Sequence, residues 1–374
     1  MTSNRPLRLA LGITLANVLA LAGIVLYVGH PDQQRGSAAS ALDRVTEFPA
    51  LLQDDFEISY FGFADANTMV VGYTLGMVSL VRPDGTLVRE FQPFHEPISS
   101  VAVSPDGTHI AVASATQVTI ARTSDPETPQ VVIPAAGNWT YGVGYGYRSH
   151  IGLAFDAGGS VLAIGSTTLQ LYDSASGALL KQLDDPKQRD IQNYNTVSVG
   201  ADGTSVFADD GFAAYSWDVA TGATLRKVVC GDAGENLVSE CFWSGDKHQW
   251  VVTDTGDGHV RVIAAETGKV VKDLAVVTTP ANRAYVSALA TTPDGTRLYT
   301  FDGNTDVKAW DWQSSRISKS TVRLAPRYAV NSGIGRMLIS PDGHTMLLAI
   351  GVASTDDNSR LDGGKSYHLW IDRM

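Results

Sequence analysis

Apolar and polar residues alternate along most of this chain in short runs, which are separated by turns rich in glycine and aspartate. The clearest unit is residues 98–120, ISSVAVSPDGTHIAVASATQVTI, where a Ser-Pro-Asp-Gly turn joins two alternating runs and a third run follows. Alternation with a period of two is typical of a β-strand with a buried face, and Asp-Gly favours the positive φ values of a tight hairpin. The pattern therefore predicts antiparallel strands joined by hairpins.

This unit recurs along the chain at intervals of roughly 40 to 50 residues, which is the length of a four-stranded propeller blade. Copies start near residues 58, 98, 150, 195, 239, 285 and 335. The seven copies predict an all-β fold, a seven-bladed β-propeller that occupies residues 42–374. The composition agrees, because 36 glycines and 44% hydrophobic residues suit many short strands with frequent turns.

A second signal ends the third strand of several units, where an aromatic residue precedes aspartate. It is present at Tyr172-Asp173, Trp217-Asp218 and Trp310-Asp311. Together with the Ser-Pro-Asp-Gly turns, these motifs resemble WD-repeat (WD40-like) propellers, above all the divergent bacterial type grouped as quinoprotein amine dehydrogenase β-chain-like or YVTN-like. The resemblance covers about residues 42–374 and implies an architecture, since propellers host unrelated activities. The Gly-His pair that opens a standard repeat is missing, so the family's His-Ser-Asp-Trp hydrogen-bond network is not expected.

The last unit ends after its third strand, so its outer strand has to come from another part of the chain. Residues 42–52, which include the run RVTEFPALL, precede the first inner strand. We expect them to supply the outer strand of the last blade, because this would close the ring and cover an open sheet edge.

The N-terminal segment predicts a single membrane-spanning signal anchor. Residues 9–28 contain no charged side chain and span about 30 Å as a helix, the thickness of a bilayer core. Two arginines in the tail of residues 1–8 keep the N-terminus in the cytoplasm, which directs the propeller to the periplasm or the cell exterior. Residues 29–41 would then be a polar linker. A cleaved signal peptide is the alternative, with Ala39-Ser40-Ala41 as its cleavage site, although the apolar run exceeds the usual signal length.

The charge and the cysteine content limit the possible partners of the protein and the compartment in which it lies. The formal net charge of −11 disfavours nucleic acid as a ligand. The two cysteines, Cys230 and Cys241, lie close in sequence, and in an exported domain they would form a disulfide that contributes about 2 to 3 kcal/mol. Two free thiols are the alternative. Without suitably spaced histidines, these cysteines predict no zinc site.

The sequence contains no recognisable catalytic signature. It has no GxSxG, Walker, HExxH or Cys-x-x-Cys motif, and its eight histidines are scattered. Several aspartates, such as Asp106, Asp202, Asp294 and Asp342, precede glycine, where turn chemistry explains them. We therefore predict no catalytic residue, no metal ligand and no cofactor.

One set of residues stands out as a candidate binding surface. In a propeller, the connections from the outer strand of one blade to the inner strand of the next lie on one rim, and such loops commonly carry binding residues. Four of these connections combine arginine with tyrosine, and Arg, Tyr and Trp are enriched in binding hot spots. The predicted partner-binding residues are Trp139, Tyr141, Tyr145, Tyr147, Arg148, Arg189, Tyr194, Arg283, Tyr285, Arg327 and Tyr328.

These features favour a non-catalytic, membrane-tethered propeller that binds a protein in the periplasm or an equivalent exported space. The arginines would also suit a small anionic ligand. One alternative is a propeller enzyme or enzyme subunit, of lyase, lactonase or dehydrogenase type, that acts on a small anionic substrate. Another is a glycan or ligand sensor whose aromatic residues stack on sugar rings. A purely structural role, in which the rim side chains stack on one another, is the remaining interpretation.

Overall fold

The structure is a computed structural model. It describes residues 46–47, 58–134, 151–183, 194, 196–230, 241–245, 248–254, 258–276, 286, 288–301, 306–323, 335–352 and 366–373. These residues are all-β, as the sequence predicts, and none of them forms a helix capable of crossing a membrane. The predicted anchor, residues 9–28, lies outside the described residues. The chain divides into two units, Met1–Ala41 and Leu42–Met374, and all described residues belong to the second.

The described strands form antiparallel sheets of four strands each, and six of these sheets are meanders of strands that are consecutive in sequence. The first three meanders are β2 (Ile58–Asp65), β3 (Thr68–Tyr73), β4 (Val78–Val81) and β5 (Leu87–Phe91); β6 (Ser100–Val103), β7 (His109–Ala113), β8 (Gln117–Arg122) and β9 (Asp125–Pro134); and β10 (Gly152–Phe155), β11 (Val161–Gly165), β12 (Leu169–Asp173) and β13 (Leu179–Gln182).

The next three meanders follow the same order along the chain. They are β14 (Thr196–Val199), β15 (Ser205–Asp209), β16 (Ala213–Asp218) and β17 (Thr224–Val229); β18 (Cys241–Ser244), β19 (Trp250–Asp254), β20 (His259–Ala264) and β21 (Val270–Ala275); and β22 (Ala288–Thr291), β23 (Arg297–Phe301), β24 (Asp306–Asp311) and β25 (Arg316–Arg323).

The last sheet combines strands from both ends of the described chain. It contains β26 (Gly335–Ile339), β27 (Thr345–Val352), β28 (Ser366–Arg373) and, as its outer strand, β1 (Thr46–Glu47). β1 runs antiparallel to β28, with Thr46 opposite Ile371 and Glu47 opposite Trp370. An edge of β28 is thereby paired with a strand from far away in the sequence.

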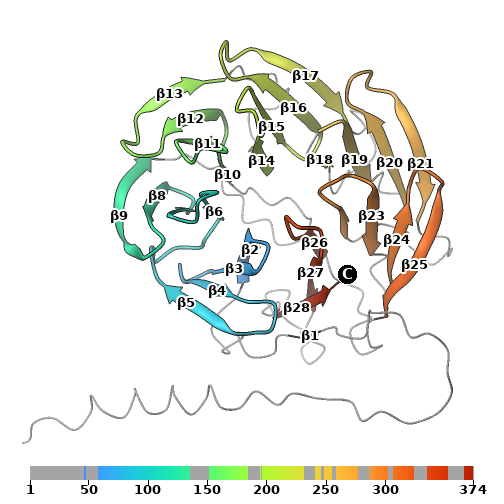
Figure 1. Cartoon of the computed structure of the whole chain (residues 1–374), viewed down its shortest axis with the longest axis horizontal. Helices are drawn as coiled ribbons and strands as arrows, with labels where there is room; N and C mark the ends of the chain where they lie inside the picture. The colour runs from blue at the N-terminus through green and yellow to red at the C-terminus, as the bar shows by residue number, and fades with distance from the viewer. Residues whose placement is uncertain are drawn as a thin grey trace, which may run out of the picture. The chain divides into compact units, whose positions relative to one another are not determined.

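Neighbouring sheets pack face to face through clusters of buried apolar side chains. Leu347 of β27 lies in one cluster with Met69 and Val71 of β3, so the last sheet also packs on the first. The sheets of Leu42–Met374 therefore follow one another in a propeller-like ring, with each inner strand near the centre and each outer strand at the circumference (Figure 1).

The strands inside each sheet are buried on both faces, because every sheet has two neighbours. In β3, Met69 and Val71 join the cluster shared with β27, whereas Val70 between them joins the cluster shared with Ile98 and Val101. Successive side chains of a strand point to opposite faces, so one strand serves both interfaces. This explains why β3 and β4 are apolar almost throughout.

The two ends of the sheets differ in their connections. At one end, which we call the turn end, hairpins join the first strand of a meander to the second and the third to the fourth. At the opposite end, which we call the loop end, hairpins join the second strand to the third, and longer connections lead to the next sheet. Antiparallel pairing fixes this arrangement, since consecutive hairpins of a meander alternate between its ends.

Basic side chains of the outer strands connect neighbouring sheets at the turn end. Arg89 of β5 donates hydrogen bonds to the carbonyl oxygens of Thr123 and Ser124, at 2.9 and 2.8 Å. Lys181 of β13 donates to the carbonyl of Ala220 in the next sheet. Lys272 of β21 repeats the arrangement with the Ser315 hydroxyl at 3.2 Å.

Candidate functional site

The predicted partner-binding residues belong to the connections between sheets. Ten of them, all except Tyr194, lie outside the described residues: Trp139, Tyr141, Tyr145, Tyr147, Arg148, Arg189, Arg283, Tyr285, Arg327 and Tyr328. In sequence they fall between β9 and β10, β13 and β14, β21 and β22, and β25 and β26. Each of these connections leaves and enters its sheets at the loop end, which makes this end the candidate site.

Tyr194 is a core residue. Its side chain is 0% exposed and its ring contacts Tyr215 and Trp217 edge to face, with centroids 5.7 and 5.3 Å apart. Its amide donates to the carbonyl of Ser166 at 2.9 Å, which ties the connection before β14 to the preceding sheet. We therefore correct its assignment as a partner-binding residue: a side chain this buried contributes packing at the base of the loop end.

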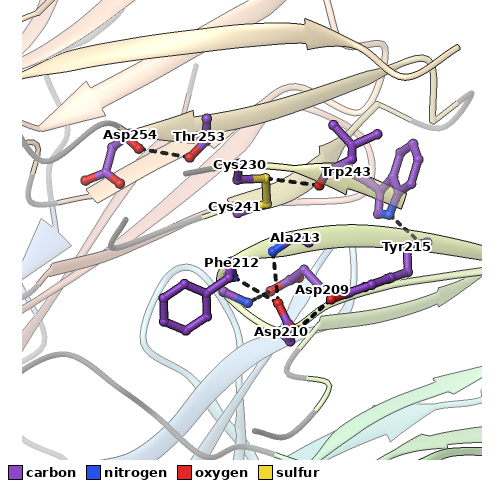
Figure 2. The surroundings of a disulfide bond; sticks show 12 residues. Asp209, Asp210, Phe212, Ala213, Tyr215, Cys230, Cys241, Trp243, Thr253 and Asp254 are labelled. Carbon is purple, nitrogen blue, oxygen red and sulfur yellow. Dashed lines mark hydrogen bonds between the residues drawn. A yellow bond between two sulfur atoms is a disulfide. The ribbon is translucent and has the colours of Figure 1, made fainter. Parts of the chain in front are cut away.

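A disulfide between Cys230 and Cys241 spans two sheets at the loop end (Figure 2). Cys230 directly follows β17 and Cys241 begins β18, so the bond joins the outer strand of one sheet to the inner strand of the next. The two Cα atoms are 6.1 Å apart, within the range usual for disulfides. Both cysteines are buried in a cluster with Ala214 and Val251, so the bond is part of the core between the two sheets.

Buried carboxylates lie beside this disulfide, and sequence reasoning missed them. Asp210 accepts hydrogen bonds from the amides of Phe212 and Ala213, both at 2.9 Å, and from the hydroxyl of Tyr215 at 2.8 Å (Figure 2). Its carboxylate thus closes the hairpin between β15 and β16 and fixes a core tyrosine. Because these three donors belong to the local backbone and the core, we interpret Asp210 as a structural cap of the loop end.

The same position recurs in other sheets. Ser114 and Ser166 occupy it after β7 and β11, and Ser114 accepts hydrogen bonds from the amides of Thr116 and Gln117, both at 3.3 Å. Asp254, the last residue of β19, matches Asp209 at the end of β15 instead, and these two side chains are 1% and 5% exposed. A signal for the cap was present in the sequence, since FADDG places Asp210 where other repeats place serine. Only its burial and its hydrogen bonds identify Asp210 as a cap.

Exposed aspartates dominate the turn end. In the hairpin between β6 and β7, the Ser104 hydroxyl donates to Asp106 at 2.6 Å and the Thr108 amide donates to the same carboxylate at 3.0 Å. These bonds favour the charged form, and the Ser104 hydroxyl contributes most to lowering the pKa of Asp106 to about 2. The carboxylates of Asp294 and Asp342 likewise accept from Thr292 and Ser340, which lower their pKa.

The polar clusters elsewhere are structural in character. On the outer strand β21, the Asp273 carboxylate accepts hydrogen bonds from His259 at 2.6 Å and from Arg261 at 3.1 Å. His248 stacks on Phe207 with centroids 3.7 Å apart, which packs it between two sheets. Within the part of the chain that the structure describes, no group of three His, Cys, Asp or Glu side chains is arranged to hold a metal ion.

Comparison with known proteins finds no family model that matches this chain and no curated protein that matches it. The resemblance to WD-repeat propellers therefore stays a prediction from the sequence motifs.

Proposed function

We propose that this protein is a closed seven-bladed β-propeller of WD-repeat type, anchored in a membrane by residues 9–28, that binds a protein partner through its loop end. The propeller would lie in the periplasm or an equivalent exported space. It would act as a scaffold without catalytic chemistry of its own.

The closed ring is supported by the packing of the described sheets. Seven sheets of four strands are described, and each packs on the next through its own apolar cluster. The pairing of β1 with β28 joins the two ends of the compact unit in one sheet. A terminal strand in this position favours a closed propeller because it leaves fewer open edges.

The exported location is supported by the disulfide. Disulfides persist in oxidising compartments and are rare in reducing ones. The two cysteines of the chain are joined in one buried bond across a sheet interface. This fits the charge distribution around residues 9–28, which directs the propeller away from the cytoplasm.

One observation carries the binding site: every connection that holds a predicted Arg-Tyr pair starts and ends at the loop end. At the same end, the sheets are held together by the disulfide, the Asp210 cap and the core ring of Tyr194. Binding loops are typically positioned by a rigid scaffold of this kind. The arginines would select a carboxylate or an acidic loop of the partner.

The proposal is tested by cross-linked co-purification of the full-length protein from membranes. The test variant carries Arg148→Ala, Arg283→Ala and Arg327→Ala together. The control variant carries Arg122→Ala, Arg297→Ala and Arg316→Ala, which remove the same charge from three exposed side chains outside the loop end. All proteins must have matching circular dichroism spectra.

We expect one specific protein to be recovered with the wild type and the control variant and lost with the loop-end variant. Loss of the partner protein with both variants would show that net charge alone causes binding, and would contradict a localised site. Recovery of no protein with the wild type would overturn the scaffold proposal.

A further inference from the structure

Exposed apolar side chains gather at the start of the outer strands, next to the hairpins of the turn end. Val88 of β5, Leu180 of β13 and Leu225 of β17 are each the extra residue of a β-bulge at the same position of their sheets. Their side chains are 49%, 53% and 55% exposed, and the preceding Leu87 and Leu179 are exposed as well. The same level of the circumference also carries Val270 and Val271 of β21 and Ile317 of β25. We call this repeated set the collar.

The collar members of neighbouring sheets lie on one continuous surface. The hairpin before each outer strand packs against the preceding outer strand: a Cβ atom at Gly177 would lie 2.5 Å from Val131 of β9, and one at Gly222 would lie 3.2 Å from Lys181 of β13. Single exposed apolar side chains are common on proteins, whereas contiguous ones mark contacts with other proteins or with membranes. The collar is therefore a candidate contact surface.

The chain enters the ring at the level of the collar. β1, the outer strand of the last sheet, begins with Thr46, which pairs with Ile371 near the end of β28. β28 ends at the turn end, because Arg373 pairs with Thr345 at the start of β27. Residues 29–45 precede β1 and reach at most about 60 Å even when fully extended. The proposed anchor would therefore keep this part of the circumference within that distance of a bilayer.

Collar residues flank β1 on both sides. The last sheet packs on the first through Leu347 and on the sixth meander through Met346, so β5 and β25 are the outer strands on either side of β1 (Figure 1). They contribute Leu87 and Val88, and Ile317, which is 49% exposed. The corresponding parts of β13 and β17 lie on the opposite side of the ring (Figure 1). The same apolar chemistry thus occurs both beside the entry point of the chain and far from it.

The two hairpins beside β1 carry balanced charges. Arg82 and Asp84 lie between β4 and β5, and Asp311 and Arg316 lie where β24 turns into β25. Asp84 accepts a hydrogen bond from the Thr86 amide at 2.9 Å, and this bond contributes most to lowering the pKa of the carboxyl group. Each arginine further favours the charged form of the neighbouring aspartate. In a protein with a net charge of −11, these hairpins are neutral overall and would not be repelled by anionic headgroups.

We propose that the part of the collar beside β1, formed by Leu87, Val88 and Ile317, rests on the bilayer surface and fixes the orientation of the ring. The contact is shallow, because the charged hairpins and the strand edges stay among the headgroups while the apolar side chains reach the acyl boundary. Attachment to the anchor makes the contact intramolecular, so a small apolar area is enough. The loop end remains accessible to the proposed protein partner. This inference rests on the proposed membrane anchor.

The test places an environment-sensitive fluorophore on an introduced cysteine of the full-length protein in phosphatidylcholine vesicles. Val88→Cys and Ile317→Cys carry the label beside β1. Leu180→Cys and Leu225→Cys are matched controls on the opposite side of the ring. The native cysteines are joined in their buried disulfide, so the introduced thiol is the site of labelling. Nitroxide-labelled phosphatidylcholine in the vesicles quenches a fluorophore that touches the bilayer.

We expect labels at Val88→Cys and Ile317→Cys to emit at shorter wavelength and to be quenched at least about twofold more strongly than the control labels, since interfacial side chains lie about 5 to 10 Å deep. Replacing both Leu87 and Val88 with aspartate should weaken the quenching at Ile317→Cys, because the added charges stay hydrated. The same replacement of Leu179 and Leu180 should leave that quenching unchanged.

Three results would overturn the proposal while leaving the anchor intact. The first is water-like emission without quenching at all four positions. The second is equal quenching at all four, which would indicate unspecific adsorption of the ring. The third is energy transfer between copies labelled at Val88→Cys without lipid quenching, which would assign the collar to a second copy of the chain. Removal of the protein from the vesicles by alkaline carbonate would contradict the anchor and, with it, this inference, so the two failures are seen separately.

Discussion

The hydrogen bonds that hold the turn-end aspartates are local, whereas several contacts at the base of the loop end join neighbouring sheets. At the turn end, Asp106 is held by Ser104 and Thr108, each two residues away in sequence. At the loop end, the amide of Ile151 donates to the Ser99 hydroxyl across 52 positions, and the disulfide joins two sheets. Turn-end hairpins can therefore form within one sheet, whereas the base of the loop end needs its neighbours in place. Contacts between sheets are suited to hold binding loops in fixed positions relative to one another.

The largest difference between the two ends is expected from glycine substitutions. Gly76 at the loop end has φ of 85°, and a Cβ atom there would lie 2.2 Å from the carbonyl oxygen of Phe94. Gly107 at the turn end has φ of 71°, with no atom within 4 Å of such a Cβ. Left-handed strain of about 1 to 2 kcal/mol applies to both, and overpacking adds about 1 to 3 kcal/mol at Gly76 alone.

Gly76→Ala should therefore destabilise the protein by about 2 to 5 kcal/mol and Gly107→Ala by about 1 to 2 kcal/mol. Urea denaturation of both variants, followed by circular dichroism, measures the free energies of unfolding. Equal losses would show that the close approach of Phe94 to Gly76 does not constrain the loop end.

Removal of the disulfide tests how much the stability of the loop end depends on a covalent bond between sheets. Replacing Cys230 and Cys241 with serine should lower the free energy of unfolding by about 2 to 3 kcal/mol, because the unfolded chain gains conformational freedom. Thermal denaturation under non-oxidising conditions measures the change. The reduced wild type serves as the control and should unfold near the temperature of the double variant. An unchanged midpoint in both proteins would contradict a stabilising role of the bond.

The smallest effect is expected at the turn end and depends on pH. The pKa of Asp106 is lowered from its ordinary value of 3.8 to about 2, chiefly by the Ser104 hydroxyl. A lowered pKa in the folded state stabilises above the unfolded value, and this stabilisation is lost as the pH falls from 3.8 towards 2. Asp106→Asn should thus be less stable than the wild type at pH 7 and should match it near pH 2.

Denaturation midpoints of the wild type and Asp106→Asn between pH 7 and pH 2 follow this convergence. Ser104→Ala provides the control, since loss of the donor should raise the pKa of Asp106 in an NMR titration. A difference that stays constant across this range would show that the charge of Asp106 does not stabilise the turn.

The repeat, the strands and the turns could be predicted because their signals are local. The alternating residues of 98–120 form β6, β7 and β8. The turn between β6 and β7 contains Gly107, which has a positive φ. The position of Tyr194 could not be predicted in the same way. Its neighbour Arg189 and the tyrosines of other connections suggested a binding surface, whereas its ring packs on Tyr215 and Trp217 from a different part of the chain.

The buried aspartates of the loop end show the same limit. Asp210 and Asp254 look like ordinary turn aspartates in sequence, and the acidic residues of the turn end look no different. Burial separates them, because Asp210 is 8% and Asp254 1% exposed, whereas Asp106 is exposed. Burial depends on which sheet packs against the hairpin, and this information is not contained in the local pattern.

By itself, the sequence determined the all-β class, the repeated hairpins and the chemistry of their turns, since these follow from contacts between residues a few positions apart. Only the tertiary structure decided that Tyr194 is core and that basic side chains such as Arg89 reach the next sheet. These features arise from packing between sheets, where the partner of a side chain is set by the position of distant strands rather than by its own neighbours.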